Sequence, residues 1–186
     1  TTSAIMDEFL DEINNNFYIN MEPEQATVNL VTALHANEIA NVISLTLDEW
    51  VLFQAQLSSV KQYLECAQMK IEEWKTSKGK KEFKPLLCEV TKINDEVALF
   101  LSMFEGKDQY SGFWFVRVSL RGYFVKENQM IPKKTPAIAL RAEDTDKLIQ
   151  SNSKLYMYRK QQKEYHDHGK NANCRLCRFM DSGVIV

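Results

Sequence analysis

The sequence predicts an α+β protein in which four antiparallel strands are followed by a helix, in a unit that occurs twice and packs its two long helices together. Two observations predict this class. The apolar residues change from a helical period to a period of two and back along the chain. A pattern that ends a strand and opens a helix also occurs twice. With 186 residues, 45% of them hydrophobic, the chain can build a core without disulfides.

The first half is predicted to hold a short helix, two strands and one long helix. Residues 3–13 have an amphipathic helical pattern, and residues 17–21 and 26–34 are short strand candidates. Thr46 and Glu49 match a capping box at the start of the long helix. Apolar residues then follow at alternating spacings of 3 and 4, at Trp50, Phe53, Leu57, Val60, Leu64, Ala67, Ile71 and Trp74. This seam is typical of a helix that packs lengthwise on another helix, and a partner-binding stripe is the alternative.

The second half is predicted to hold four strands and a helix. A basic linker precedes strands at residues 85–93, 96–104 and 113–125. A basic loop at 132–136 leads into a short strand at 137–140, and a helix runs over 142–165. We therefore divide the chain into an acidic segment (1–25), a degenerate first copy (26–75), a linker (76–84), a complete second copy (85–165) and a tail (166–186).

The repeated pattern marks the end of each copy's last strand. It reads Ile43-Ser44-Leu45-Thr46-Leu47-Asp48-Glu49 in the first copy and Ile138-Ala139-Leu140-Arg141-Ala142-Glu143-Asp144 in the second, 95 residues later. Phe53 and Leu148 lie at matching offsets. Acidic residues in a first helical turn favour the helix dipole, so convergence is the alternative. We interpret the likeness as a duplicated strand-to-helix unit.

The charge is unevenly distributed along the chain. Residues 1–50 contain nine acidic residues and no lysine or arginine. Residues 51–186 contain the other 16 of the 25 acidic residues and all 23 lysines and arginines, which gives them a net charge of +7. A polyanion would therefore meet the C-terminal part, and a protein partner could use the acidic N-terminal region. The alternative is ordinary solvated surface.

One stretch of the second copy matches a known pattern. Leu120-Arg121-Gly122-Tyr123-Phe124, the basic loop and Ile138-Ala139-Leu140 together resemble the end of the positive cofactor four family of single-stranded-DNA-binding transcriptional coactivators. The resemblance implies four antiparallel strands and a helix in a homodimer with paired helices, which a tandem copy would turn into an intramolecular pseudo-dimer. The first copy lacks the arginine-tyrosine strand and has no lysine or arginine before its helix, and Gly122 replaces the family's polar residue.

The candidate nucleic-acid-binding residues come from strand alternation and from the resemblance. Alternation places aromatic and arginine side chains of residues 113–123 on one face, with Phe100 and Phe104 on the neighbouring strand. The resemblance adds Arg121, Phe124 and the basic loop. The set is Phe100, Phe104, Phe115, Arg117, Arg121, Tyr123, Phe124, Lys126, Lys133 and Lys134. The alternative is that the aromatic side chains lie under a loop or in a dimer interface.

Four residues of the tail have the chemistry of a zinc site. His166, His168, Cys174 and Cys177 supply two imidazoles and two thiolates, which suit tetrahedral zinc. The alternative is a disordered basic tail. A redox pair is disfavoured because no βαβ pattern precedes it. The few cysteines favour a reducing intracellular compartment. The resemblance to transcriptional coactivators favours the nucleus before the cytoplasm. No leader or apolar run typical of a signal peptide or membrane span is seen.

These observations favour a non-enzymatic protein that binds single-stranded nucleic acid, DNA before RNA, in transcription or replication. The sequence contains no nucleophile elbow, P-loop, dinucleotide-binding or zinc-protease motif. The alternative is a protein-interaction or structural assembly module that uses the same sheet face.

We expect the purified protein to hold about one zinc per chain, because thiolate and imidazole ligands bind zinc tightly once they are deprotonated. Cys174→Ser should release the metal, as measured by atomic emission under reducing conditions. Cys66→Ser is the control, because this cysteine lies outside the tail, and it should leave the metal content unchanged. A parent protein without zinc would contradict the site.

Overall fold

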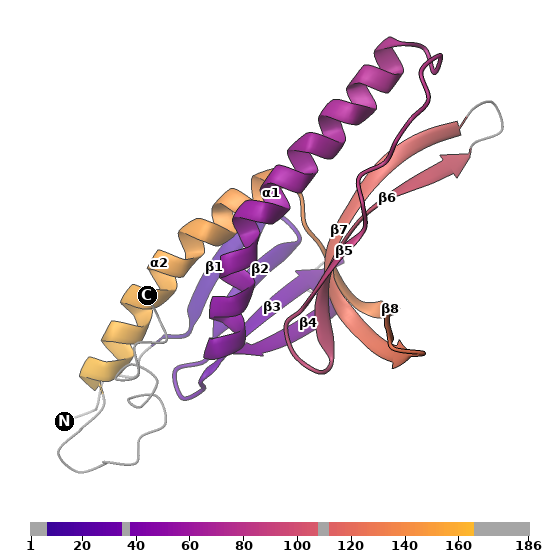
Figure 1. The fold of residues 1–186 in the computed structure, drawn as a ribbon. Coiled ribbons are helices and arrows are strands. Elements are labelled where there is room, and N and C mark those ends of the chain that lie inside the picture. Colours follow the sequence, from indigo (N-terminus) through magenta and orange to yellow (C-terminus); the bar gives the residue numbers. More distant parts are fainter. Residues whose placement is uncertain (1–6, 35–37, 108–111, 166–186) are drawn as a thin grey trace. The chain divides into compact units, whose positions relative to one another are not determined.

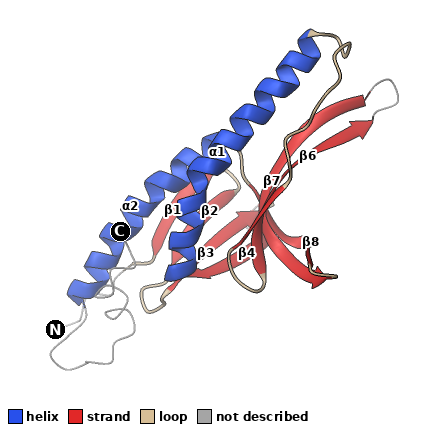
Figure 2. Ribbon diagram, viewed as in Figure 1, coloured by secondary structure: helices blue, strands red, loops and turns tan. Residues whose placement is uncertain are grey.

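The computed structural model describes residues 7–34, 38–107 and 112–165. In this part the chain runs twice through four strands and one helix (Figures 1 and 2). The elements are β1 Phe9–Asn14, β2 Phe17–Met21, β3 Thr27–Ala33, β4 Ile39–Thr46, α1 Leu47–Thr76, β5 Glu89–Lys92, β6 Val97–Lys107, β7 Gly112–Lys126, β8 Gln129–Ala139 and α2 Ala142–Tyr165.

The strands form two antiparallel four-stranded sheets of the same topology. One sheet has the order β1-β2-β3-β4 and the other the order β5-β6-β7-β8, so every strand pairs with its neighbour in sequence. Each sheet is followed by one helix. The predicted α+β class and the duplicated strand-to-helix unit are therefore confirmed.

The repeated pattern lies where each sheet passes into its helix. Ile43 and Leu45 lie near the end of β4, Ile138 lies near the end of β8, and Leu140 follows β8 directly; all four are buried, as are Phe53 and Leu148. The two helix starts are capped in complementary ways. The backbone N–H of Glu49 donates to Thr46 Oγ1 at 3.3 Å, whereas the backbone N–H of Arg141 donates to Asp144 Oδ2 at 3.1 Å. Each bond is one half of a capping box.

The described residues divide into two compact units that exchange their helices. One unit combines the residues up to Ala55 with those from Asp146 onward, and the other comprises Gln56–Thr145. The first unit therefore joins sheet β1–β4 to α2, and the second joins sheet β5–β8 to the larger part of α1. Each sheet is accompanied by the helix that follows the other sheet in sequence.

In the first unit, α2 and the start of α1 are fixed by side-chain contacts. The ring of Tyr158 lies 5.4 Å from that of Phe9, and its hydroxyl donates to the carbonyl of Asp7 at 3.0 Å. Ser151 and Lys154 of α2 both bond the carboxylate of Asp11. Two bonds then join the helices to each other: Trp50 Nε1 donates to Asn152 Oδ1 at 2.9 Å, and Gln54 Nε2 donates to the carbonyl of Leu148 at 2.8 Å.

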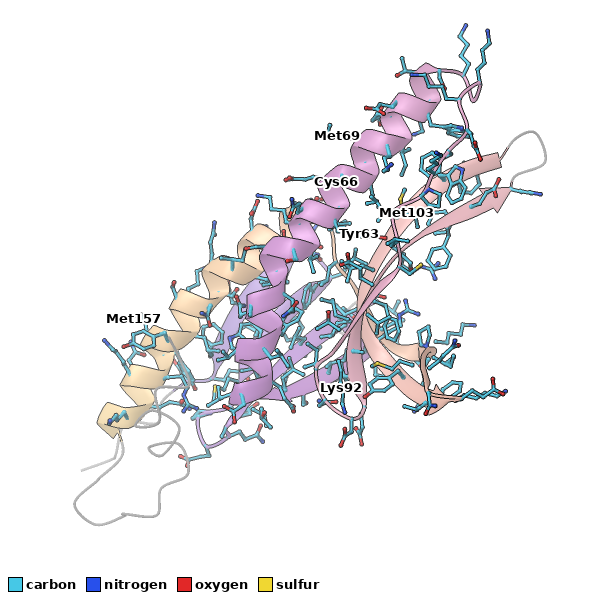
Figure 3. The ribbon with its side chains drawn as sticks, viewed as in Figure 1. Tyr63, Cys66, Met69, Lys92, Met103 and Met157 are labelled. Atoms are coloured by element: carbon cyan, nitrogen blue, oxygen red, sulfur yellow. The ribbon has the colours of Figure 1, made fainter. Side chains whose placement is uncertain are left out.

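In the second unit, the later part of α1 packs on the sheet. Ala67 and Ile71 form a buried cluster with Met103 of β6, and Trp114 and Val116 of β7 pack against it. Tyr63 and Met103 lie between the helix and the sheet, whereas Met69 points away from it (Figure 3). The predicted seam is buried from Trp50 to Ile71. The prediction that all of it packs on the second helix is wrong, because from Ala67 onward its described partners are β6, β7 and the segment before β5.

Three predicted boundaries are also wrong. Residues 3–13 were predicted to be helical, but Phe9–Asn14 is β1. Phe9 pairs with Met21, and both side chains are buried on the face that Tyr158 of α2 contacts; this tertiary gain overrides the local helical pattern. Sheet β1–β4 consequently begins before residue 26 and has four strands. The basic stretch 132–136, predicted as a loop, lies within β8.

Truncation of one buried residue of the repeat should destabilise the fold. Phe53 is fully buried, so Phe53→Ala should lower the free energy of unfolding by about 3–5 kcal/mol, as measured by urea denaturation. The neighbouring Leu52 is 40% exposed, and Leu52→Ala should cost less than about 1 kcal/mol. Equal losses in the two variants would contradict the assignment of Phe53 to the core.

Stability should decline at alkaline pH because of Tyr63. Its hydroxyl donates to the carbonyl of Leu87 at 3.0 Å, and burial, followed by the nearby Cys88 and Glu89, raises its pKa to about 12. The unfolded tyrosine ionises near pH 10, so the unfolded state loses its proton first. The stabilisation is complete below about pH 10 and is lost as the pH rises towards 12. Urea denaturation of the parent and of Tyr63→Phe across this range should show a smaller decline in the variant.

Candidate nucleic-acid interface

The candidate interface lies on one face of the ribbon formed by β6 and β7. These strands pair without interruption from Val97 opposite Gly122 to Lys107 opposite Gly112. Phe104 is directly opposite Phe115, and Ser102 is directly opposite Arg117. Directly opposed residues point to the same face of a sheet, so this register brings the predicted aromatic and arginine side chains of two strands together.

Four side chains form an aromatic–arginine cluster on this face: Phe104, Phe113, Phe115 and Arg117. The rings of Phe104 and Phe115 stack with centroids 5.6 Å apart, and Phe113 lies 6.0 Å from Phe115. The guanidinium carbon of Arg117 lies 5.0 Å from the Phe104 centroid and 5.7 Å from that of Phe115. Phe104 and Phe113 remain 40% and 41% exposed. The cluster therefore offers ring surface and a cation to the solvent.

Arg121 continues the same face towards β8 and is held by two hydrogen bonds. Its Nε donates to Ser119 Oγ at 2.8 Å, and its Nη1 donates to the carbonyl of Lys133 at 3.3 Å. Partial burial, and then the positive charge of Arg117, lower the pKa of Arg121. An arginine nevertheless keeps its proton at neutral pH. Two neighbouring cations on one face repel each other, and a bound anion would relieve that repulsion.

A bulge in β8 places the two predicted lysines beside Arg121. Arg121 pairs with Ala137, but Tyr123 pairs with Pro132, so residues 133–136 form extra chain opposite Gly122. A Cβ at Gly122 would lie 3.2 Å from Pro136 Cδ, which gives a physical reason for glycine where the family has a polar residue. Lys133 and Lys134 are exposed on this bulge.

Two predicted binding residues, Phe100 and Tyr123, are buried. They form a small core cluster with Ala98, against which Met130 of β8 packs. The Tyr123 hydroxyl donates to the carbonyl of Asn94 at 2.7 Å. Their prediction as exposed stacking surfaces is therefore wrong. Alternation identified their face correctly, but the turn before β6 and the start of β8 supply cover that the strand sequence does not reveal.

Two other predicted residues lie on the opposite face of the ribbon. By alternation, Phe124 and Lys126 point away from the side of Arg121. They flank a tight hairpin turn in which Glu127 and Asn128 have φ of 52° and 61°, as a type I′ turn requires. Phe124 is 46% exposed there. The structure thus brings together Phe104, Phe115, Arg117 and Arg121 with the bulge lysines, and separates Phe124 and Lys126 from them.

Phe113 belongs to the cluster although it was not among the predicted binding residues. Its ring covers Gly106 on the paired strand, where any Cβ would collide with it. The signal that could have identified it was the alternation that placed it on the same face as Phe115 and Arg117. A glycine directly opposite an aromatic residue is a further indication of such cover.

The equivalent face of sheet β1–β4 has a different chemistry. Its cross-strand rows include Leu10 opposite Asn20, Glu12 opposite Tyr18, and Asn29 opposite Ser44. No lysine or arginine occurs in the first 50 residues, so this face carries acidic and neutral groups only. The same topology therefore presents a cationic, aromatic face in one sheet and an anionic, polar face in the other.

The predicted metal ligands His166, His168, Cys174 and Cys177 lie outside the described residues. Within the described ranges, no group of three or more histidine, cysteine, aspartate or glutamate side chains could hold a metal ion. Cys66 and Cys88 are exposed and form no disulfide. In the same part of the chain, neither helix is long and apolar enough to cross a membrane.

Comparison with known proteins leaves the family open, since no protein-family model and no curated protein matches this sequence. The likeness to the positive cofactor four family therefore rests on the motif residues alone.

Proposed function

We propose that the protein binds single-stranded nucleic acid, DNA in the first place, through the aromatic–arginine cluster, Arg121 and the bulge lysines. The observation that carries the proposal is the position of Arg117 over the rings of Phe104 and Phe115. These side chains lie on the sheet face opposite α1, and a second arginine, Arg121, lies close to Arg117. Exposed rings interleaved with guanidinium groups are the combination that binds unpaired bases and the phosphates between them.

The expected mode of binding is stacking combined with charge neutralisation. Bases would stack on Phe104, Phe113 and Phe115, at about 1–3 kcal/mol per base, because every base offers a π face. Arg117, Arg121 and the bulge lysines would meet phosphates. A duplex hides its base faces within the stack, so this surface favours single strands. Stacking and phosphate contacts do not distinguish one base from another, so the affinity should be largely independent of the nucleotide sequence.

The first sheet serves as a structural partner in this proposal. Its face carries Glu12 and no basic group, and would repel phosphate. One chain would then supply a single binding face within an intramolecular pseudo-dimer. A role in transcription or replication follows from the family resemblance.

The second candidate function is a protein-interaction module that uses the same face. Phe104 and Phe113 are large apolar side chains that remain 40% and 41% exposed, and adjoining exposed rings are also typical of protein interfaces. The two functions differ in their response to salt, because only phosphate neutralisation releases several counterions.

Arg121→Ala should weaken binding to a single-stranded oligonucleotide by about 1–3 kcal/mol and reduce the salt slope by about 0.7, because one phosphate contact is lost. Phe115→Ala should weaken binding by a similar amount with little change in slope, since stacking releases no counterions. Fluorescence anisotropy at several salt concentrations measures both quantities.

The matched control is Lys147→Ala. Lys147 is exposed on α2, in the other compact unit, and does not belong to the proposed binding face. Its removal should leave affinity and slope unchanged. If Arg121→Ala binds as tightly as the parent at every salt concentration, this face is not the nucleic-acid site and the protein-interaction function takes its place.

A further inference from the structure

A dense group of lysines lies at the end of α1 and just after it. Residues 75–84, called the lysine segment here, contain five lysines and one acidic residue, Glu82. All five lysines are exposed: Lys75, Lys78, Lys80, Lys81 and Lys84. None of them belongs to the aromatic–arginine cluster, and the binding face described above gives them no role.

The backbone of the lysine segment is fixed by a helix cap. The N–H of Gly79, at φ 71°, donates to the carbonyl of Trp74 at 3.1 Å, and Ser77 Oγ donates to the same carbonyl at 2.7 Å. Lys80 N donates to the carbonyl of Ser77 at 3.2 Å. The C-terminal end of a helix dipole also favours cations. The lysines are therefore presented from an ordered turn.

An aromatic ladder attaches this segment to β7. Phe83 stacks on Trp114 with centroids 4.4 Å apart and planes at 23°, and it meets Trp74 edge-on at 6.1 Å. Leu86 N donates to Met103 Sδ at 3.4 Å. The lysines on either side of Phe83 consequently lie close to the same stretch of β7 that carries Phe113 and Phe115.

The sheet is narrow at this level. Trp114 lies between Phe113 and Phe115 in sequence, and its side chain points to the face that α1 covers. Among the described residues, β5 pairs with β6 only as far as Leu101, and β8 pairs with β7 only from Ser119 onward. The ribbon near Trp114 is thus two strands wide, and a flexible polymer could pass around its edge from one face to the other.

A cavity of about 200 Å³ lies between the end of α1 and the lysine segment. Lys70, Lys81 and Lys84 line it together with the rings of Trp74 and Phe83. Glu73 and Glu82 also line it, and their two negative charges neutralise only part of the positive charge of the three lysines. Lysines beside half-buried aromatic rings repeat, on this side of the ribbon, the combination of residue types in the aromatic–arginine cluster.

We propose that the lysine segment is a second contact for the phosphate backbone of the same nucleic-acid strand, which leaves the aromatic–arginine cluster and passes around the ribbon. This inference rests on the proposed function. It predicts that the lysine segment contributes to affinity only for longer oligonucleotides, because a short strand can occupy the cluster alone and a longer one reaches both surfaces.

The test compares Lys80→Gln/Lys81→Gln with a matched double variant, Lys147→Gln/Lys160→Gln, whose lysines are exposed on α2 in the other unit. Each loses two charges. Binding is measured with oligothymidylates of about 6 and about 20 nucleotides, a range that spans typical single-strand site sizes. The first variant should bind the long oligomer about tenfold more weakly, with a salt slope reduced by about 1.4, and the short oligomer as the parent does. The control should resemble the parent with both.

Glu82→Gln should change the affinity for the long oligomer in the opposite direction, because it removes a carboxylate that lines the cavity. It should tighten binding of the long oligomer and leave the short one unaffected. If the parent binds both oligomers and the lysine variant matches it at both lengths, the second contact is disproved while the proposed function stands. If the parent binds neither oligomer, the proposed function fails and this inference fails with it.

Discussion

The constraint on which the rest of the structure depends is the need of each four-stranded sheet to bury one apolar face. A meander of short strands cannot do so alone. In each compact unit the helix that covers the sheet follows the other sheet in sequence. This exchange accounts for the length of α1, which supplies Trp50 and Gln54 to the first unit and Ala67 and Ile71 to the second. It also accounts for a seam that stays apolar from Trp50 to Trp74, along most of the 30-residue helix.

The duplicated topology has not kept the same surface in both copies. The strand-to-helix pattern is retained because its isoleucine and leucine side chains are buried in both. The solvent-facing sides are free of that requirement and have diverged in charge. Arg117 and Arg121 lie on the second sheet, whereas the first 50 residues hold no lysine or arginine. Under the proposed function, the first sheet is the structural copy and the second sheet is the binding copy.

Strand alternation proved reliable for the direction of a side chain and unreliable for its exposure. It placed Phe100, Phe115, Arg117 and Tyr123 on one face, and the register of β6 and β7 agrees. Exposure depends on what lies above that face. The carbonyl of Asn94 and the side chain of Met130 cover Tyr123 at one end of the ribbon, while the other end, at Phe104 and Phe113, stays open.

The sequence by itself determined the α+β class, the repeat, the apolar seam and the main elements of the second copy, because these follow from local periodicity and capping. Tertiary structure decided the rest. Residues 9–14 became a strand because pairing with β2 directs Phe9 and Ile13 to the buried face of the sheet, where α2 contacts it. The helices were exchanged between sheets because burial of the whole apolar surface, which no local pattern encodes, selects the partner of each face. The same long-range contacts separated the open cluster around Arg117 from the buried pair of Phe100 and Tyr123.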